Sequence, residues 1–427
     1  MTHHTINPNS SSAPRASSRI NHMLSVLHCT RSLMRPLPPL APWILGLLVG
    51  CTAAPPPSPP AVEAAVPAVA SPPASAGASS APLLASAPSA GAAAIVRARS
   101  RWVPVDWADL PGWQADRTLE LWPALLRGCD KPAPGWASVC VAATRLPPQT
   151  DADARAWLQQ QLQPYRIEAL DGAADGLITG YIEARLDAQR RPSPQARVAL
   201  HAPPADLGAR QPYWTRQQLD TVPAARAALA GRELAWVADP LDALFLQIQG
   251  SGRVLMKEAD GSRKVVRLTY AGHNGQPYKS VGKWLIEQGE LRAEQASWPD
   301  IKQWAQAHPK RVNEMLWSNP RVVFFREEPL TDPQAAPLGA QGVPLTPRRS
   351  IAVDSQSIPY GTPVWLDTTE PLTNTPLRRL VMAQDTGSAI VGAVRADYFW
   401  GWGDEAEAQA GRMKQPLRMW ALWPAQR

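Results

Sequence analysis

The sequence of 427 residues contains few of the residue types on which many functional sites depend. It has four Cys, seven His and four Phe, only 19% of its residues are charged, and no run of five basic residues occurs. Because residues 1–50 contain four Arg and no acid, the rest of the chain has 39 basic and 36 acidic residues. This balance does not favour a nucleic-acid partner. The length predicts two folded units with accessory segments.

Common catalytic motifs are also missing. The sequence has no nucleophile elbow, phosphate-binding loop, dinucleotide fingerprint or HExxH pair of zinc ligands. Beyond residue 98 only His201, His273 and His308 occur, and none lies near a plausible Ser or Cys nucleophile in the sequence. No His or Cys cluster has the spacing of zinc ligands. We therefore expect no metal and no cofactor, and carboxylates become the candidate catalytic groups.

Residues 1–50 are expected to be a leader rather than part of a fold. Arg35 precedes an apolar stretch, residues 43–49, that is too short to span a bilayer. The stretch ends in Leu-Val-Gly-Cys51, which resembles the bacterial lipobox, where cleavage precedes a Cys that carries the lipid. A buried apolar segment that ends in Cys is the alternative. By resemblance to lipoprotein sorting, Thr52 favours the outer membrane, with the protein facing the periplasm.

Residues 51–98 are expected to form a tether that begins at the lipidated Cys. Ala, Pro and Ser dominate, and Glu63 is the single charged residue before Arg97. Such a composition offers nothing to pack, and its X-Pro bonds favour extended conformations. At ~3.1 Å per residue, a polyproline-like segment of this length reaches on the order of 100 Å. The body that follows can therefore act well away from the lipid surface.

Two Cys remain in the body, Cys129 and Cys140. In an exported protein this spacing favours a disulfide that closes a small loop, and two unpaired buried thiols are the alternative.

The body from residue 99 mixes helical and strand patterns. Asp239 and Pro240 supply an N-cap and a first-turn Pro for a helix that ends at Gln249. The strands expected near the C-terminus suggest a small barrel or sandwich. Further helices are expected over 151–162, 280–288 and 299–315, the last with a break at Pro309, and strands over 176–185, 253–256, 264–269, 322–325, 350–353, 363–366, 380–383 and 419–423.

One strand, residues 380–383, leads through Gln384 to Asp385 and then into a Thr-Gly turn. Aspartic proteases carry the same Asp-Thr-Gly tripeptide. Their chemistry needs two Asp that share one proton, and this chain has the tripeptide once. A protease is therefore the weaker hypothesis.

The wider context of Asp385 resembles the family of membrane-bound lytic murein transglycosylase A. The shared motifs occur in order over roughly residues 165–425. Ile182 and Ala184 depart from the Tyr and Pro that are usual in the first motif, and Ser388 stands where Gly is common. The motifs are Thr179-Gly-Tyr-Ile-Glu183, Gln249-Gly-Ser-Gly252, Tyr270-Ala-Gly-His-Asn-Gly275, Asn319-Pro-Arg-Val-Val-Phe-Phe325, Ile358-Pro-Tyr-Gly-Thr-Pro363, Ala383-Gln-Asp-Thr-Gly387 and Arg395-Ala-Asp-Tyr-Phe-Trp-Gly401.

The resemblance implies a mainly β fold with helices. It consists of a double-psi β-barrel domain plus an inserted second β-rich domain, with a groove between them. The barrel is expected from residues 99–184 together with 326–427, the "3D" domain named for three aspartates. The inserted substrate domain is expected over residues 185–325.

The same resemblance implies cleavage of the β-1,4 bond between N-acetylmuramic acid and N-acetylglucosamine in peptidoglycan without water. Hydrolysing glycosidases need two carboxylates. If the C6 hydroxyl of the sugar attacks C1, one Asp can act first as acid and then as base, which leaves 1,6-anhydro ends. The implied partners are glycan strands, the membrane through the lipid anchor, and a cell-wall synthesis or remodelling complex. A non-catalytic peptidoglycan-binding lipoprotein is the alternative.

The three aspartates of the module map to Asp354, Asp385 and Asp397. Asp385 occupies the family's catalytic position, and it must be protonated at working pH, so its pKa must be raised by burial or by a nearby acid. Asp397 can supply a neighbouring negative charge or orient the loop. Asp354 follows a strand and precedes a turn, where an Asp ordinarily bonds to the backbone.

Several other residues are candidates for binding the sugar. The turn from Gln249 to Gly252 brings backbone groups and two polar side chains close to a ligand, although a plain turn is the alternative. Indole faces stack on sugar rings, but most Trp are core residues. The substrate-binding candidates are Gln249, Gly250, Ser251, Gly252, Tyr181, Tyr278, Ser280 and Trp400, the last with its neighbour Trp402.

Overall fold

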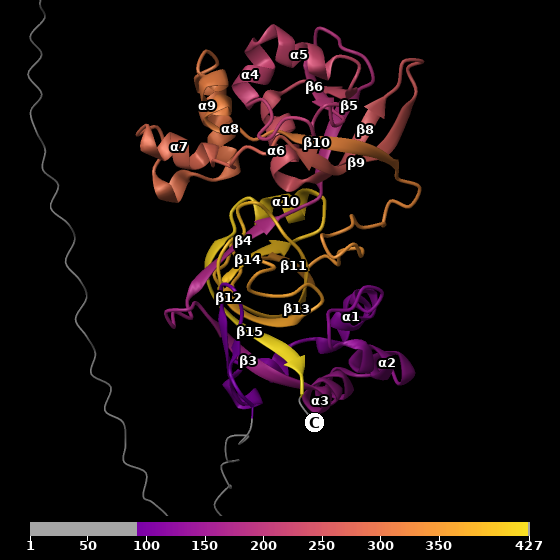
Figure 1. Ribbon diagram of the computed structural model, residues 1–427, viewed down its shortest axis with the longest axis vertical. Helices are drawn as coiled ribbons and strands as arrows, with labels where there is room; N and C mark the ends of the chain where they lie inside the picture. The colour runs from indigo at the N-terminus through magenta and orange to yellow at the C-terminus, as the bar shows by residue number, and fades with distance from the viewer. Residues whose placement is uncertain (1–91, 426–427) are drawn as a thin grey trace, which may run out of the picture. The chain divides into compact units, whose positions relative to one another are not determined.

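The computed structural model describes residues 92–425 (Figure 1). The expected leader, the expected lipidation site Cys51 and most of the expected tether lie outside these residues. The described chain forms a nine-stranded and a six-stranded sheet, and helices pack on both. None of the helices in the described part is both long and apolar enough to cross a bilayer.

Six strands of the larger sheet close into a barrel. They follow the order β15-β12-β13-β11-β14-β4, and β15 also pairs with β4. The pairs β11–β13 and β14–β4 are parallel, and the other pairs are antiparallel. The bounds are β4 (Gly176–Tyr181), β11 (Ser350–Val353), β12 (Pro363–Thr369), β13 (Pro376–Asp385), β14 (Arg395–Phe399) and β15 (Lys414–Pro424).

Alternate residues of these strands fill the barrel, as the two-residue period of a strand requires. Ile178, Val381, Tyr398 and Met419 are buried in one apolar cluster. The residues between them on β4 and β14 point the other way, outside the barrel. The strands therefore supply a rigid wall from which polar side chains project.

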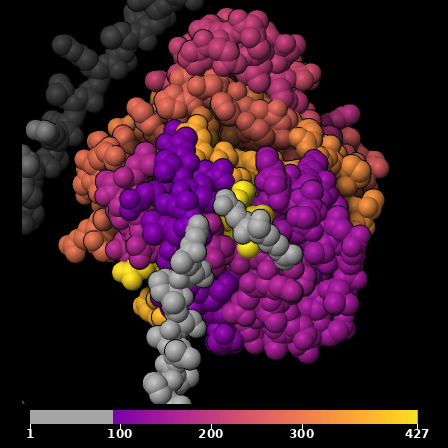
Figure 2. Space-filling model, turned by 60° about the horizontal axis from the view of Figure 1, so that its bottom comes forward, coloured from indigo at the N-terminus to yellow at the C-terminus, as the bar shows by residue number. Residues whose placement is uncertain are grey.

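The N-terminal part of the described chain extends the sheet and covers one side of it. β3 pairs with β15, and the sheet continues through β2 to β1. Helices α1–α3 pack a Trp-rich cluster against β12 and β15. Figure 2 shows these early residues, in indigo and magenta, with the C-terminal residues in yellow between them. The elements are β1 (Ile95–Val96), β2 (Arg101–Pro104), α1 (Trp122–Gly128), α2 (Ala137–Arg145), α3 (Asp151–Gln161) and β3 (Leu162–Glu168).

Local chemistry defines two features of this part. Thr150 caps α3 by accepting a hydrogen bond from the Asp153 N–H, while the Asp153 carboxylate bonds back to the Thr150 N–H. Cys129, which follows α1, is joined to Cys140 in α2 by a disulfide.

The smaller sheet lies in the sequence between β4 and β11. Its strand order is β10-β9-β8-β5-β7-β6, with β5 and β8 parallel. Helix α6 (Pro240–Gln249) packs on it, begins at the cap Asp239 and ends at Gly250, whose φ of 83° is left-handed. The strands are β5 (Ala184–Gln189), β6 (Val198–His201), β7 (Glu233–Val237), β8 (Ser251–Lys257), β9 (Arg263–His273) and β10 (Val323–Pro329).

Two further helical clusters flank this sheet (Figure 1). One packs α7, α8 and α9 against the other side of α6, and the second packs α4 and α5 near β10. The helices are α4 (Arg216–Thr221), α5 (Pro223–Leu229), α7 (Val281–Glu287), α8 (Trp298–Ala307) and α9 (Val312–Ser318), and α10 (Asp404–Ala410) contacts β4 of the barrel.

The chain passes between the two sheets at Ile182 and Glu183. The Glu183 carboxylate is fully buried and accepts hydrogen bonds from Arg253 at 2.8 Å and Arg267 at 2.5 Å. Both guanidiniums also donate to the Ala335 carbonyl, and the Arg253 guanidinium stacks over the Trp402 ring at 3.9 Å. A buried cluster of opposite charges therefore holds the crossover in place.

Most expected elements are present, with three corrections. The strand expected over 176–185 is two strands, because the chain changes sheets after Tyr181. The turn expected from Gln249 to Gly252 consists of Gly250 alone, since Ser251 and Gly252 already belong to β8. The run Arg395–Phe399, expected only as a motif, is the barrel strand β14.

Candidate functional site

A cavity of about 700 Å³ lies where the barrel faces the smaller sheet, and we call it the Asp385 groove. Asp385 is the single acidic residue among those that line it. Neutral polar and aromatic side chains make up much of its wall. Its lining includes Tyr181, Gln249, Gly250, Ser251, Tyr270, His273, Arg321, Arg326, Ala340, Asp385, Ser388 and Phe399.

Asp385 is the last residue of β13, so the sheet fixes its backbone while its side chain reaches the groove. Its Oδ2 accepts a hydrogen bond from the Tyr181 hydroxyl at 2.8 Å, and its Oδ1 accepts one from the Ala340 N–H at 3.0 Å. Burial raises the pKa of this carboxyl, and hydrogen bonds from Thr386, Tyr181 and Ala340 oppose the rise. The arrangement favours a proton-carrying acid held in one orientation.

Asp397 lies on the neighbouring strand β14, paired with Thr179 of β4. Its Oδ1 accepts a hydrogen bond from the Thr179 hydroxyl at 2.6 Å, and the same hydroxyl is bonded by Arg395 at 2.9 Å. Burial raises the pKa of Asp397 to about 6, the Thr179 hydrogen bond and the charge of Arg395 oppose the rise, and the charge of Asp385 adds to it. The two carboxyls are therefore electrostatic neighbours.

Asp354 lies away from the groove lining. Its Oδ2 accepts hydrogen bonds from Arg99 at 3.0 Å and from the Gly392 N–H at 2.9 Å, and its Oδ1 accepts from the Gln356 N–H at 3.0 Å. These bonds tie the loop after β11 to the loop before β14. The structure thus places Asp354 in the backbone-bonding position and does not bring it together with Asp385 and Asp397.

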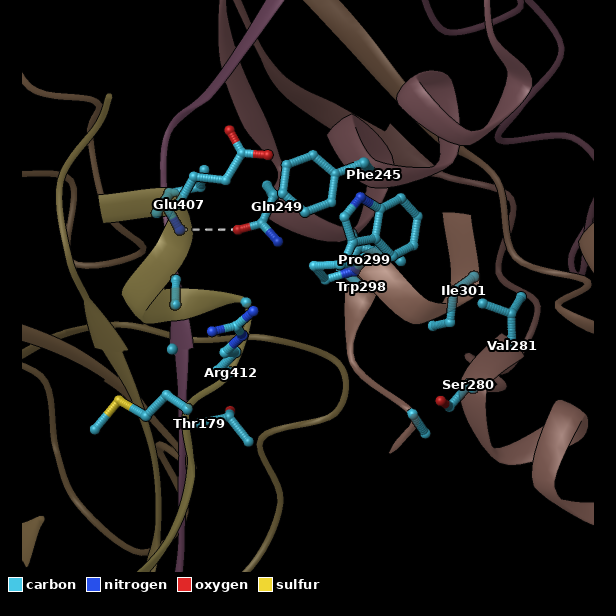
Figure 3. Close-up of a pocket in the computed structure, with 18 of the residues that line it drawn as sticks. Thr179, Phe245, Gln249, Ser280, Val281, Trp298, Pro299, Ile301, Glu407 and Arg412 are labelled. Carbon is cyan, nitrogen blue, oxygen red and sulfur yellow. Dashed lines mark hydrogen bonds between the residues drawn. The ribbon is translucent and has the colours of Figure 1, made fainter. Parts of the chain in front are cut away.

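A second cavity, of about 420 Å³, adjoins the groove, and we call it the Phe245 pocket (Figure 3). Phe245 stacks on Trp298 along one wall, at 4.9 Å between ring centroids, and Glu407 and Arg412 project from the opposite wall. Gln249 lines both cavities, and its Oε1 accepts a hydrogen bond from the Ile182 N–H at 2.9 Å, drawn as the dashed line. Its side-chain oxygen is thus engaged with the crossover.

Tyr278 and Ser280 line the Phe245 pocket and not the Asp385 groove. Ser280 is the N-cap of α7, where its hydroxyl accepts a hydrogen bond from the Lys283 N–H at 3.2 Å. Burial raises the pKa of Tyr278, a hydrogen bond with Ser280 opposes the rise, and the charge of Asp397 adds to it. The two residues therefore lie on the Asp397 side of the site.

Two of the residues expected to contact the sugar line neither cavity. Trp400 is only 4% exposed, its indole N–H points to the Met413 sulfur at 3.3 Å, and it lines neither cavity. Gly252 is buried in β8, where a Cβ would lie 2.5 Å from Leu246 and 3.0 Å from the Ala184 carbonyl oxygen. Both positions serve packing.

The two cavities also contain functional groups that the sequence interpretation missed. The Ala340 N–H, which donates a hydrogen bond to Asp385, is a backbone group, so the residue type does not reveal it in the sequence. Thr179 could have been found, because it lies two residues before Tyr181 and so on the same face of β4. Arg321 lies within a quoted motif, but nothing in the local pattern indicates that it reaches the loop after Asp385.

Across residues 92–425, no group of three or more His, Cys, Asp or Glu side chains is arranged to hold a metal ion.

Two family models match the chain. The MltA specific insert domain matches residues 177–326, and the 3D domain matches residues 349–423. The first range covers the smaller sheet, and the second carries the three aspartates of the barrel.

Curated relatives match along part of their length. Membrane-bound lytic murein transglycosylase A of Vibrio cholerae is 35% identical over 201 residues, which are 45% of this chain and 52% of the relative. The protein of the same name from Escherichia coli K12 is 31% identical over 278 residues, 63% of this chain and 72% of the relative. The chain therefore spans about half of the first relative and nearly three quarters of the second.

Solved structures agree in fold. The lytic transglycosylase LtgG of Burkholderia pseudomallei is 49% identical (TM-score 0.53, 76% of this chain and 96% of that one), and MltA of Neisseria gonorrhoeae is 31% identical (TM-score 0.64, 79% and 96%). E. coli MltA with bound chitohexaose is 25% identical (TM-score 0.61, 78% and 94%). The chain belongs to the membrane-bound lytic murein transglycosylase A family, so it is a homologue of these enzymes.

Proposed function

We propose that this protein is a lytic transglycosylase that cleaves the β-1,4 bond between N-acetylmuramic acid and N-acetylglucosamine in peptidoglycan and leaves 1,6-anhydromuramoyl ends. Asp385 is the general acid and then the general base. The observation that carries the proposal is that Asp385 is the single carboxyl in the groove lining and has a raised pKa. Binding of chitohexaose by the E. coli relative supports a glycan as the ligand.

The reaction needs one proton to leave Asp385 and one to return. In the first step the protonated carboxyl gives its proton to the glycosidic oxygen, and the bond from C1 to that oxygen breaks. The C6 hydroxyl of the same muramic acid residue then bonds to C1, and its proton passes to the Asp385 carboxylate. The acid is regenerated, no water is consumed, and no second carboxylate is required, unlike in hydrolysing glycosidases.

The hydrogen bonds to Asp385 serve both steps. Tyr181 and the Ala340 N–H hold the two carboxyl oxygens in place, so the proton is presented in a fixed direction. They also stabilise the carboxylate that exists between the steps. Burial favours the protonated resting form, and these bonds keep the pKa from rising so far that the proton is no longer given up.

Asp397 acts as a positioning residue in this proposal. Burial and the charge of Asp385 raise its pKa, and the Thr179 hydrogen bond ties it to the strand that carries Tyr181. Asp354 stabilises the loops behind the groove. The lipid anchor at Cys51 and the outer-membrane location remain predictions from the sequence.

The test is a digest of purified sacculi by the wild type and by Asp385→Asn, with the products identified by mass spectrometry. The wild type is expected to release 1,6-anhydro muropeptides, and the variant is expected to lose at least about a thousandfold of this activity, since general acid–base catalysis contributes up to about 10⁴-fold. Asp404→Asn, at an exposed acid on α10, is the matched control. Circular dichroism and retained binding to sacculi check that the variant is folded.

Other outcomes identify other functions. Products one water heavier, with reducing ends, indicate a hydrolase. Binding to sacculi without soluble products from the wild type indicates a peptidoglycan-binding lipoprotein. Undiminished anhydro products from Asp385→Asn contradict the role given to this carboxyl. Cleavage of a protein substrate, with no cleavage of glycan, would indicate that the single Asp-Thr-Gly is a protease motif.

A further inference from the structure

Arg321 places a cation in the Asp385 groove. It precedes β10, and its guanidinium Nε donates to the Gln276 carbonyl at 2.8 Å while Nη1 donates to the Ser388 hydroxyl. Ser388 is three residues after Asp385, so their Cα atoms are at most about 11 Å apart. The guanidinium is therefore fixed at the far end of the loop that begins with the catalytic carboxyl.

This cation has no counter-charge in the described part of the chain. No carboxylate there lies within 4.0 Å of Arg321, and both side-chain hydrogen bonds go to neutral oxygens. The neighbours that face it are Tyr270 and His273. Burial and the charge of Arg321 lower the pKa of His273, so this imidazole is neutral at pH 7.

Of the two arginines that line the groove, Arg326 has a carboxylate partner and Arg321 has none within the described residues. Arg326 lines the same groove, but its Nε bonds the Glu328 carboxylate at 2.8 Å and its Nη1 bonds the Tyr270 carbonyl at 2.7 Å. A partly buried guanidinium is costly to leave unpaired, and paired charges are the rule in such positions. Arg321 is thus in place to receive an anion from outside the chain.

We propose that Arg321 binds a carboxylate on the lactyl branch of the muramic acid residue whose C1 is attacked, so that the groove selects strands with a negative charge at that branch. This inference rests on the proposed function. An N-acetylglucosamine ring is neutral and gives a guanidinium nothing to pair with. Muramic acid differs by an ether-linked lactyl group on C3, which ends in a free carboxylate in stripped strands and in a peptide with its own carboxylates in substituted ones.

The chemistry of the site suits a carboxylate. A guanidinium presents paired N–H donors that match the two oxygens of a carboxylate, and Arg321 Nη2 has no hydrogen-bond partner among residues 92–425. In the proposed mechanism Asp385 starts protonated, a form that its burial favours, so it does not repel an incoming anion. Ser388 and the Gln276 carbonyl hold the guanidinium in place, which lowers the cost of binding.

The experiment compares Arg321→Gln with the wild type on three substrates. These are glycan strands stripped of peptide by an amidase, the same strands with the lactyl carboxylate converted to a methylamide, and strands that keep their peptides. We expect KM of the variant on stripped strands to rise about tenfold, the value for one charge-assisted hydrogen bond, with kcat unchanged. On amidated strands the two proteins should have equal KM.

Matched variants separate charge from structure. Arg321→Lys keeps the cation and should recover part of the preference for stripped over amidated strands. Arg326→Gln removes a paired cation from the same groove and should leave the ratio of the two KM values as in the wild type. Ser388→Ala removes one of the hydrogen bonds that hold the guanidinium but keeps the cation, so it should lose less of the preference than Arg321→Gln does.

Each result decides the proposal. A rise in KM on stripped strands alone assigns the free lactyl carboxylate, and a rise on stripped and peptide-bearing strands assigns carboxylates of either source. An equal loss on all three substrates, no change on any, or the same loss of preference in Ser388→Ala overturns it in favour of a structural tie. If the wild type releases no anhydro product from any strand, the proposed function itself fails, independently of Arg321.

Discussion

The Tyr181 hydroxyl donates a hydrogen bond to Asp385 at 2.8 Å, although the two residues are 204 positions apart in the sequence. Tyr181 is the last residue of β4, and Asp385 is the last residue of β13. The strands of the smaller sheet lie between them in the sequence. Both are held by strands of one barrel, so their relative position depends on the closure of the sheet and not on a flexible loop.

Removing this hydrogen bond should change the pH dependence of activity. The bond lowers the pKa of Asp385, so Tyr181→Phe raises it. Because the reaction begins from the protonated acid, activity falls as pH rises through this pKa, and the fall should move to higher pH in the variant. We also expect kcat to drop by about tenfold as the carboxyl loses its orientation. Profiles of kcat/KM against pH measure both effects.

Tyr270→Phe is the control, because Tyr270 lines the groove without bonding Asp385. A fall in activity that moves to lower pH in Tyr181→Phe would contradict the prediction.

Asp397 should destabilise the fold as it ionises. Its pKa is about 6 in the folded protein and 3.8 as the ordinary value, so the folded state holds the proton more tightly. The stabilising contribution of the protonated Asp397 is therefore fully present below about pH 4 and is lost as the pH rises towards 6. Asp397→Asn removes this loss. The free energy of unfolding of the variant should therefore exceed that of the wild type by up to about 3 kcal/mol at pH 8 and match it near pH 4. Urea unfolding at the two pH values tests this, and a difference that does not change with pH is the contrary result.

Neutralising Glu183 should cost much of the stability of the crossover. Arg253 and Arg267 are both buried, and without this carboxylate they keep their charge with no acid beside them. Breaking a buried pair in this way costs about 3–5 kcal/mol. We expect Glu183→Gln to lower the free energy of unfolding by this amount in urea titrations. Asp175→Asn, which breaks an exposed pair with Arg418, should change it by less than about 1 kcal/mol. Equal effects of the two substitutions would contradict the importance of burial.

The disulfide should stabilise the N-terminal helices without affecting catalysis. It links positions eleven apart, and closing such a short loop contributes about 2–3 kcal/mol. The double variant Cys129→Ala, Cys140→Ala should melt at a lower temperature and keep its kcat well below that temperature, because neither Cys lines the groove. Wild type treated with reductant should match the variant in calorimetry, and an unshifted melting temperature would show that the loop is held by packing alone.

The sequence predicted local structure where local chemistry decides it. The helix after Asp239 begins at its cap and first-turn Pro, and the strands at 350–353 and 363–366 carry strong apolar patterns. The strand Arg395–Phe399 was missed as an element because its two charged residues, Arg395 and Asp397, do not look like strand residues; in the structure both bond to the Thr179 hydroxyl of β4.

The site was predictable only in part, for a physical reason. A motif identifies Asp385 and Tyr181 but not the bond between them, which depends on the register of β4 against β14. Trp400 looked like a sugar contact because of its place after Asp397, yet the strand's alternation turns Trp400 into the core with Tyr398. Arg321 and the Ala340 N–H reach the groove through long-range packing that no local pattern encodes.

The pairing of β15 with β4 has a consequence for the assembly of the site. β15 is the final strand, and it completes the ring that also contains the strands of Tyr181 and Asp385. During folding the ring can close only after β15 has paired with β4 and β12. The hydrogen bond between Tyr181 and Asp385 therefore depends on a strand that neither residue belongs to, the one that completes the ring.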